Sequence, residues 1–412
     1  MNAREERGLV IAALCKLNKT PQGWLVPSQS GQQIYTVDPV AQTCTCPDHQ
    51  DRKEKCKHIY AVEFTIKREI HADGSVTETR SITFTQKKVY KHDNAAFNAA
   101  QSVEKDRFQE LLFDICRNLP EPERSCRGRK PHSTKDAVFS MAFKVYSTFS
   151  ARRFSSDLRE AHRRGYLSRP VPGMKVCGFM EDPDYAPLLK GLIAWSARPL
   201  RSVETDFAID STGFSTCKFE TWYDQKYGIT RRKCAWIKAH IAVGVKTNVI
   251  TAVRVLDKDS ADSPQFPVLV KKTAENFTIR EMSADKAYSS LEAFELVNAC
   301  GGTAFIPFKS NATGGVGGLF EKMFHYFQFK NEEYMDHYHK RSNIESTNSM
   351  VKRKFGDHLR SRTDDAMVNE CLCKLLCHNL CVLIQEQHEL GIEPIFWPEN
   401  PSNAALTMTQ PE

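Results

Sequence analysis

The sequence predicts an α/β protein, with a small α+β module at its N-terminus and a helical, basic segment between the two. Three observations lead to this prediction. Beyond residue 204, short apolar runs with several β-branched residues alternate with helical patterns, which is typical of strands covered by helices. Before residue 90, cysteines and a histidine gather in a polar stretch that follows a strand pattern and precedes a short helix. Between these parts, helical segments carry a large excess of positive charge.

Length and composition indicate a soluble protein of two or three domains. The chain has 412 residues, of which 26% are charged and 41% hydrophobic. No apolar run approaches the roughly 18 residues of a membrane span, and the N-terminus does not read as a secretory signal. The net charge, 57 − 50 = +7, favours a polyanionic partner. With no export signal, the 14 cysteines are expected in a reducing cytosol rather than in disulfides.

Four stretches follow one another along the chain. We expect a small cysteine-containing module at 1–90, a helical basic region at 91–200, an α/β domain at 201–395 and a disordered tail at 396–412. In the first stretch, residues 24–26 and 34–37 predict a hairpin, and the spacing of Ile59, Val62 and Ile66 predicts a helix. A second hairpin is expected within 70–90.

The helical region is the most basic part of the chain. Between Arg124 and Arg169, twelve Lys/Arg face three Asp/Glu, a local charge of +9. Helices are expected at 134–146 and at 157–164, the second capped by Ser155 or Ser156. A solvated surface is the simpler interpretation, but arginine dominates and suits phosphate, so we favour a DNA-binding helical module. Its candidate contacts are Arg152, Arg153, Arg163 and Arg164.

The pattern Cys44-x-Cys46-x9-Cys56-x-His58 supplies three thiolates and one imidazole, the ligand set of a closed structural zinc site. The surrounding residues are polar and would not bury free thiols in a core. His49 is the alternative fourth ligand. A second group of four cysteines lies near the C-terminus, and three of them fall on one stripe of an expected helix, among leucines. Core packing explains this group better than metal binding. That group is Cys371, Cys373, Cys377 and Cys381.

Two aspartates stand where α/β folds place their chemistry. Asp210 ends the apolar strand expected at 207–209, and Asp285 ends the strand expected at 279–284. Two divalent cations that run phosphoryl transfer need such neighbouring carboxylates. Asp206 lies on the same strand face and competes with Asp210. The acidic loop that follows, with Asp257, Asp259 and Asp262, is interpreted as turn and capping residues.

A helical pattern supplies a third carboxylate. Tyr338, Arg341, Glu345 and Lys352 stand at offsets 0, 3, 7 and 14, which on a straight helix places them within an arc of about 60°. From Tyr338 to Arg362, seven Lys/Arg oppose two acids. A solvated charged stripe is the alternative interpretation.

These motifs carry two resemblances. The C-x-C-x(n)-C-x-H pattern resembles the SWIM zinc finger, a family that binds DNA or protein. Residues from about 130 to 390 resemble DDE transposases of bacterial insertion sequences, marked by a Y-(2)-R-(3)-E-(6)-K signature whose spacings are all met here. The family's two aspartates match Asp210 in Ala-Ile-Asp-Ser-Thr and Asp285 in Ala-Asp-Lys-Ala-Tyr.

The second resemblance implies a ribonuclease-H-like mixed-sheet core in which Asp210, Asp285 and Glu345 hold two Mg²⁺ ions, or Mn²⁺ in their place. Arg341 and Lys352 would hold DNA phosphates, and Tyr338 would stack on a base or position a phosphate. The 60 residues from Asp285 to Glu345 leave no room for the large β-rich insertion of some relatives, which puts a hairpin intermediate in doubt. A SWIM finger is also not universal in that family.

The resemblance further implies a bacterial, cytoplasmic, nucleoid-associated protein that binds transposon ends and target DNA, as a homodimer and without a membrane. Two alternatives remain open from the sequence. One is a catalytically inactive DNA-binding regulator that uses the zinc finger and basic helices. The other is a Mg²⁺-dependent nuclease that cuts DNA without joining it.

Overall fold

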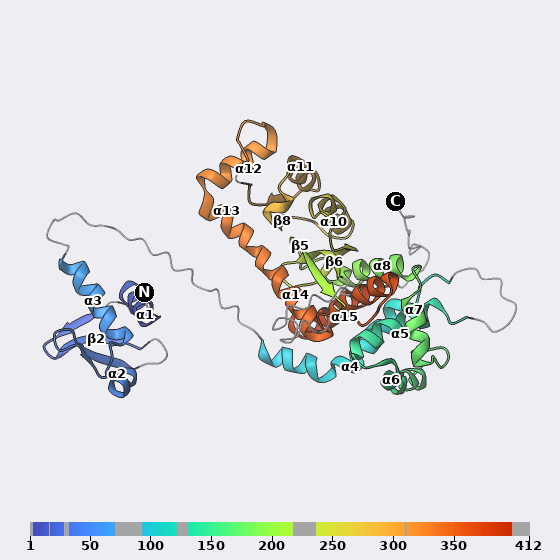
Figure 1. Ribbon diagram of the computed structural model, residues 1–412, viewed down its shortest axis with the longest axis horizontal. Helices are drawn as coiled ribbons and strands as arrows, with labels where there is room; N and C mark the ends of the chain where they lie inside the picture. The colour runs from blue at the N-terminus through green and yellow to red at the C-terminus, as the bar shows by residue number, and fades with distance from the viewer. Residues whose placement is uncertain are drawn as a thin grey trace, which may run out of the picture. The chain divides into compact units, whose positions relative to one another are not determined.

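The computed structural model describes residues 3–15, 17–28, 33–70, 93–121, 131–216, 236–309 and 311–397 (Figure 1). The chain divides into two compact units, residues 1–91 and 92–412. Nearly all of the hairpin expected at 70–90 and of the tail expected at 396–412 lies outside the described residues. The first two residues of that tail, Phe396 and Trp397, are buried in the second unit.

The N-terminal unit is a small antiparallel sheet packed with helices. Its strands run in the order β1-β2-β3-β4, and the expected hairpin is confirmed by the pairing of Trp24 with Val37 and of Val26 with Tyr35. Alternate side chains of β2, Trp24 and Val26, enter the core. The elements are α1 (Ala3–Leu14), β1 (Asn18–Thr20), β2 (Gly23–Pro27), β3 (Ile34–Asp38), β4 (Thr43–Cys44), α2 (Pro47–Arg52) and α3 (Lys57–Ile70).

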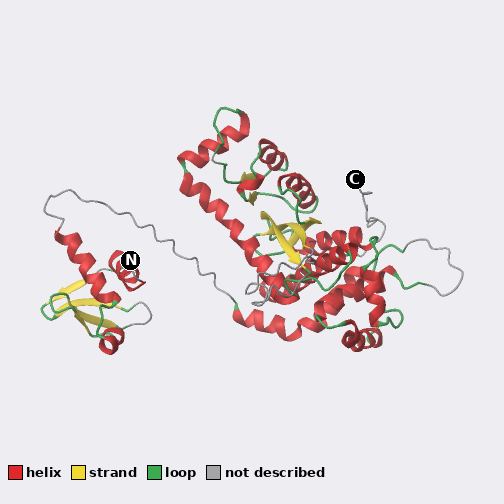
Figure 2. Ribbon diagram, in the orientation of Figure 1, coloured by secondary structure: helices red, strands yellow, loops and turns green. Residues whose placement is uncertain are grey.

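The second unit is built on a mixed five-stranded sheet with the order β7-β6-β5-β8-β9 (Figure 2). Strands β5, β6 and β7 are antiparallel neighbours, and in the β6–β7 pair His240 lies opposite Arg254 and Val243 opposite Ile250. Strands β8 and β9 continue the sheet in parallel with β5. The strands are β5 (Asp206–Ser215), β6 (Trp236–Gly244), β7 (Ile250–Asp257), β8 (Glu281–Ala284) and β9 (Thr303–Phe305).

Helices that come before, between and after the strands in the sequence complete this unit. Those that precede the sheet are α4 (Asn94–Cys116), α5 (Thr134–Ser147), α6 (Ala151–Arg163), α7 (Gly173–Met180) and α8 (Tyr185–Ala197). Those within and after it are α10 (Phe266–Ala274), α11 (Leu291–Ala299), α12 (Gly318–Phe329), α13 (Asn331–Tyr338), α14 (Ser342–Phe355) and α15 (Asp364–Leu390). Short 3₁₀ turns are η2 (Arg198–Leu200), η3 (Ser263–Gln265), η4 (Lys286–Tyr288) and η5 (His339–Arg341).

Helix α15 joins the helical region to the sheet, because it packs on α4, α5 and α8 and also contacts β6 and β7. The buried Asn379 amide binds both backbone groups of Ile250 in β7, at 2.8 and 2.7 Å, and the Ser196 hydroxyl of α8 at 2.9 Å. A buried amide with all of these partners fixes the register of three elements. The helices expected as a separate region therefore share one core with the sheet.

Helix α15 is the one described helix long and apolar enough to span a membrane, but 89% of its most apolar window is buried inside the protein. Of its four cysteines, Cys371, Cys373 and Cys377 are fully buried and Cys381 is partly buried. This confirms core packing for the C-terminal cysteines, and burial raises the pKa of the Cys371 and Cys381 thiols to about 12.

Candidate functional site

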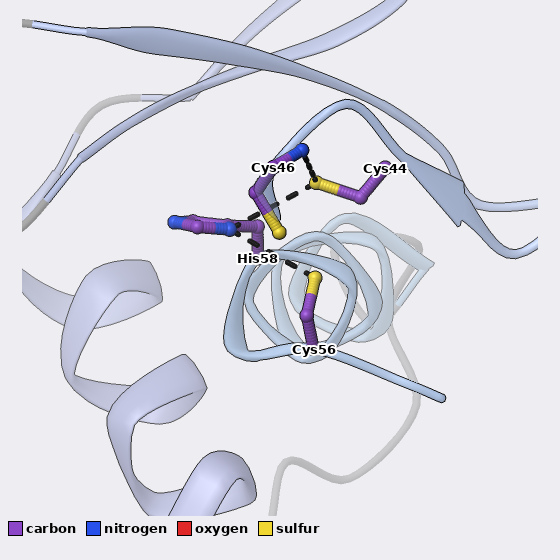
Figure 3. Close-up of side chains that lie close together, drawn as sticks. All are labelled: Cys44, Cys46, Cys56 and His58. Atoms are coloured by element: carbon purple, nitrogen blue, oxygen red, sulfur yellow. Dashed lines mark hydrogen bonds between the residues drawn. The ribbon is translucent and has the colours of Figure 1, made fainter. Parts of the chain in front are cut away.

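A thiol and imidazole cluster forms where the sheet of the N-terminal unit meets the start of α3 (Figure 3). Cys44 ends β4, and Cys46 is the N-cap residue of α2. Cys56 directly precedes α3, and His58 lies in its first turn. The short loop after β4 thus brings the first two ligands to a helix start that carries the other two. All four side chains are buried.

The geometry fits a tetrahedral zinc ion. The four candidate ligand atoms lie within 4.8 Å of one another, and His58 Nδ1 is 3.8 Å from the sulfurs of both Cys44 and Cys56. The hydrogen bond to Cys56, together with burial, raises the pKa of Cys44, whereas that of Cys56 is lowered to about 3 by the Cys44 thiol. Three thiols this close cannot all ionise without a cation, and Zn²⁺ is the ion that three thiolates and one imidazole select.

The structure separates His49 from this cluster. Its side chain is only partly buried, and Nδ1 lies 2.8 Å from the carbonyl oxygen of Glu54. The cluster that the structure brings together therefore contains His58, and His49 lies outside it.

The two aspartates meet at the end of the parallel strand pair. Ile209 of β5 pairs with Ala284 of β8, so Asp210 and Asp285 are the next residues on adjacent strands. Burial raises the pKa of Asp210, and the negative charges of Asp285 and Glu345 add to that rise. The expectation that the strand ends at Asp210 was wrong, because β5 continues to Ser215 through its pairing with β6. What ends at this point is the parallel pairing of β5 with β8, whose last pair is Ile209 with Ala284.

Arg341 links the strand pair to α14. Its Nη1 lies 3.7 Å from Asp210 Oδ2 and 3.2 Å from Glu345 Oε1. Glu345, in the first turn of α14, has a side chain that is 66% exposed and free to approach a ligand. The straight helix expected here is instead divided by η5, so Tyr338 ends α13 and Arg341 ends the 3₁₀ turn. Tyr338 and Arg341 still interact, and this contact helps raise the pKa of Arg341.

An open groove of about 680 Å³ runs along α14 from Glu345. Lys352 lines it, half-buried, with its Nζ 5.5 Å from the centre of the Phe214 ring. Burial lowers the pKa of Lys352. The other lining residues, Thr212, Asn348, Ser349, Arg353 and Asp357, are polar. A polar groove that begins at a carboxylate and continues past two cations suits a polyanion.

Asp206, the competing candidate, belongs to a separate ion-pair cluster. Lys340 in η5 lies 2.8 Å from Asp206 of β5 and 2.6 Å from Glu281 of β8, and Arg280 binds Asp206 through two hydrogen bonds. Although burial opposes its ionisation, these cations lower the pKa of Asp206. Sequence reasoning missed this cluster because Lys340 and Glu281 are 59 residues apart.

A second polar group beside the aspartates was also missed. Asp262, interpreted as a turn residue, lies 2.6 Å from Lys238 Nζ and 3.4 Å from the buried ring of His240. In the β5–β6 ladder His240 pairs with Ser211, the neighbour of Asp210. The Lys238-Ala239-His240 run on β6 was a signal that the sequence offered for a polar group here. The sequence did not reveal that Asp262, in the loop after β7, is its partner.

The basic helix α6 begins earlier than expected. Its cap is Ser150, whose hydroxyl accepts from the Arg153 amide, rather than Ser155 or Ser156. Arg152 and Arg153 are exposed, whereas Arg163 pairs with Glu160 at 2.5 Å and Arg164 with Asp106 at 2.6 Å. Two of the four predicted arginine contacts thus remain available to an external anion without breaking an ion pair among the described residues.

Comparison with known protein families matches both parts of the chain. Residues 201–380 match the model of the transposase DDE domain, and residues 33–67 match that of the SWIM zinc finger. No solved structure matches the chain. The first match confirms the ribonuclease-H-like mixed-sheet core. The chain is thus a protein with a transposase DDE domain at residues 201–380 and a SWIM zinc finger at residues 33–67.

Proposed function

We propose that the chain is a DNA transposase that cleaves the ends of an insertion sequence and joins the 3′-hydroxyl to target DNA. One observation carries the proposal: Asp210 and Asp285 follow the last pair of a parallel strand pair, and Arg341 lies between Asp210 and Glu345. The groove along α14 leads directly to this carboxylate set. An inactive regulator would have no need for two neighbouring strand-end aspartates that an arginine joins to a glutamate on α14.

The carboxylate set fits divalent metal ions of the Mg²⁺ type. Carboxylate oxygens are the ligands that Mg²⁺ and Mn²⁺ prefer. Burial raises the pKa of Asp210, and the charges of Asp285 and Glu345 add to that rise, which is the situation that a bound dication relieves. Asp210, Asp285 and Glu345 would hold two such ions, which supply an activated attacking oxygen and charge stabilisation on the leaving oxygen.

The remaining residues of the site act on the DNA itself. Arg341 and Lys352 would bind phosphates on either side of the reacting one, and Tyr338 would stack on a base or bind a phosphate through its hydroxyl. Arg152 and Arg153 on α6 add exposed positive charge for the same duplex. Because an element has two ends, we further propose that two copies of the chain act together on DNA.

The test of the proposed function is a cleavage and joining assay. The substrate is a duplex that carries the terminal inverted repeat found beside the gene, incubated with the full chain and Mg²⁺. We expect a nick that leaves a 3′-hydroxyl at the repeat boundary, followed by joining of that end to a target duplex. Cleavage without joining would identify a nuclease, and binding without cleavage a regulator.

We predict that Lys340 positions the site without contacting DNA. Replacing Lys340 by methionine leaves two nearly buried carboxylates, Asp206 and Glu281, without their shared cation. The start of α14 should then shift, and a shift of about 1 Å at Glu345 should slow cleavage by roughly tenfold to a hundredfold. The measurement is the cleavage rate as a function of Mg²⁺ concentration, with DNA affinity measured in parallel.

Two further variants decide whether this effect is one of positioning. Lys340→Arg retains the charge and should recover much of the rate. Lys330→Met removes a lysine whose pair with Glu333 is solvent-exposed, and it should cleave like the wild type. Equal rates for Lys340→Met and Lys330→Met would contradict the prediction.

A further inference from the structure

A second pocket, separate from the groove, lies between the helical region and the start of α15. It has a volume of about 280 Å³ and is bounded by the end of α5, by α7, and by the loop that follows α14. Its charged lining comprises Lys144, Arg360, Arg362 and Lys374 against Glu181 and Glu370. Val145, Val176, Met180 and Phe355 supply apolar walls.

The loop that forms one wall is held rigidly by α15. Buried Lys374 donates to the carbonyl oxygens of Gly356 and His358 at 2.9 and 2.7 Å. Glu370 accepts from the backbone amides of Arg360 and Ser361, at 2.8–3.1 Å. Both α15 side chains are thereby engaged in loop contacts, and the pocket is formed before any ligand arrives.

Two cations of this pocket form no direct ion pair. Among the described residues, the side chains of Lys144 and Arg362 make no direct hydrogen bond or ion pair, although Glu370 acts on Lys144 from a distance. Arg360 donates to the carbonyl oxygens of Thr148 and Phe149, which keeps its guanidinium at the pocket but leaves its charge uncompensated. Burial, and then the charge of Arg360, lowers the pKa of Lys144. An anion placed between these side chains would relieve that repulsion.

The end of α14 and the loop that follows it contribute to both the pocket and the groove. Asp357 lines the groove, and Arg360 to Thr363 of the same loop line the pocket. Glu345 marks the start of the groove and Phe355 a wall of the pocket, 355 − 345 = 10 residues apart on α14. Ten helical residues span about 15 Å. That length corresponds to about four base-pair rises of 3.4 Å.

We propose that this pocket binds one backbone phosphate of the DNA duplex, about four base pairs from the phosphate that reacts. This inference rests on the proposed function, because it takes the groove along α14 as the path of the DNA. Guanidinium and ammonium groups together suit a phosphodiester, which accepts a forked hydrogen bond from one and a point charge from the other. The contact would fix the register of the duplex on the protein rather than read its sequence.

The experiment measures how binding of the terminal-repeat duplex depends on salt, in Mg²⁺-free buffer without chelator so that zinc is retained. The double variant Lys144→Met, Arg362→Met is compared with the matched control Lys271→Met, Lys322→Met, which removes two exposed lysines outside both pockets. Loss of one phosphate contact should reduce the slope of log affinity against log salt by about one. The control should keep the wild-type slope. Equal slopes for the two double variants would overturn the proposal.

A second arm locates the phosphate. Single methylphosphonate substitutions, which remove one charge at a time, are placed along the same duplex. The wild type should lose affinity at one phosphate about four base pairs from the cleavage point, and the double variant should lose nothing further there. An equal loss in both proteins would overturn the assignment. If the wild type passes both arms but fails to cleave in Mg²⁺, the proposed function fails and the phosphate pocket stands.

Discussion

Replacing Cys46 and Cys56 together by serine is expected to abolish zinc binding and to unfold the N-terminal unit. Each change removes one of four converging ligands, and the remaining pair cannot hold a closed site. The unit is small, and its buried core includes the three cysteines themselves. Binding of a structural zinc ion contributes about 10–16 kcal/mol in small metal-dependent domains, which is more than such a core supplies alone.

The measurement is elemental analysis of the full chain, combined with limited proteolysis of residues 3–70. The wild type should carry about one zinc per chain and resist cleavage in that region. Cys15→Ser, Cys177→Ser is the matched control, because it removes two thiols outside the cluster. An undiminished zinc content in the Cys46, Cys56 double variant would show that the cluster is not the metal site.

Asp210→Asn and Asp285→Asn should each reduce DNA cleavage by at least about a hundredfold while the chain still folds and binds its duplex. The amide has the shape of the carboxylate but lacks the charge that holds a divalent cation. Metal-ion catalysis supplies several kcal/mol, and each 1.4 kcal/mol corresponds to about tenfold in rate. Glu345→Asp should fail similarly, because its carboxylate would be withdrawn by more than about 1 Å.

Two strand aspartates serve as comparisons in the same cleavage assay. Asp257→Asn removes an exposed carboxylate at the end of β7 and should cut like the wild type. Asp206→Asn removes the carboxylate that pairs with Arg280 and that shares Lys340 with Glu281, and it should slow cleavage only through the position of η5. If Asp210→Asn cut normally in Mg²⁺ and Asp206→Asn did not, the metal-binding role would have to be reassigned to Asp206.

The zinc ligands and several helices and strands could be predicted from the sequence because their signals lie within short segments of the chain. Cys44, Cys46, Cys56 and His58 lie within 15 residues, so their types and spacing specify a ligand set before any tertiary structure is considered. The same holds for the hairpin of β6 and β7, whose apolar runs and turn are contiguous. The spacing of Tyr338, Arg341, Glu345 and Lys352 likewise indicated a helical segment, although it could not reveal the 3₁₀ turn at η5.

The choice between neighbouring candidates was decided only by the tertiary structure. Asp206 and Asp210 share a strand face, and their roles differ because β8 pairs in parallel and brings Asp285 beside Asp210 and Glu281 beside Asp206. His49 and His58 were both plausible ligands from the sequence, but the loop places the His49 ring against the Glu54 carbonyl oxygen and buries His58 among the cysteines. The distinction between the two aspartates depends on register between strands about 75 residues apart, and local sequence patterns carry no information about register.

The sequence by itself therefore determined the chemistry that is available: a thiol and imidazole set, strand-borne aspartates, a helix-borne glutamate and an excess of basic residues. Only the tertiary structure decided which of these groups meet. Lys340 reaches Asp206 across 134 residues, and Asn379 ties α15 to a strand 129 residues earlier. The pocket of Lys144 and Arg362 is assembled from segments more than 200 residues apart. The physical reason is that ion pairs, buried amides and pockets form between surfaces that the folded core brings together, and burial then sets how strongly each group interacts.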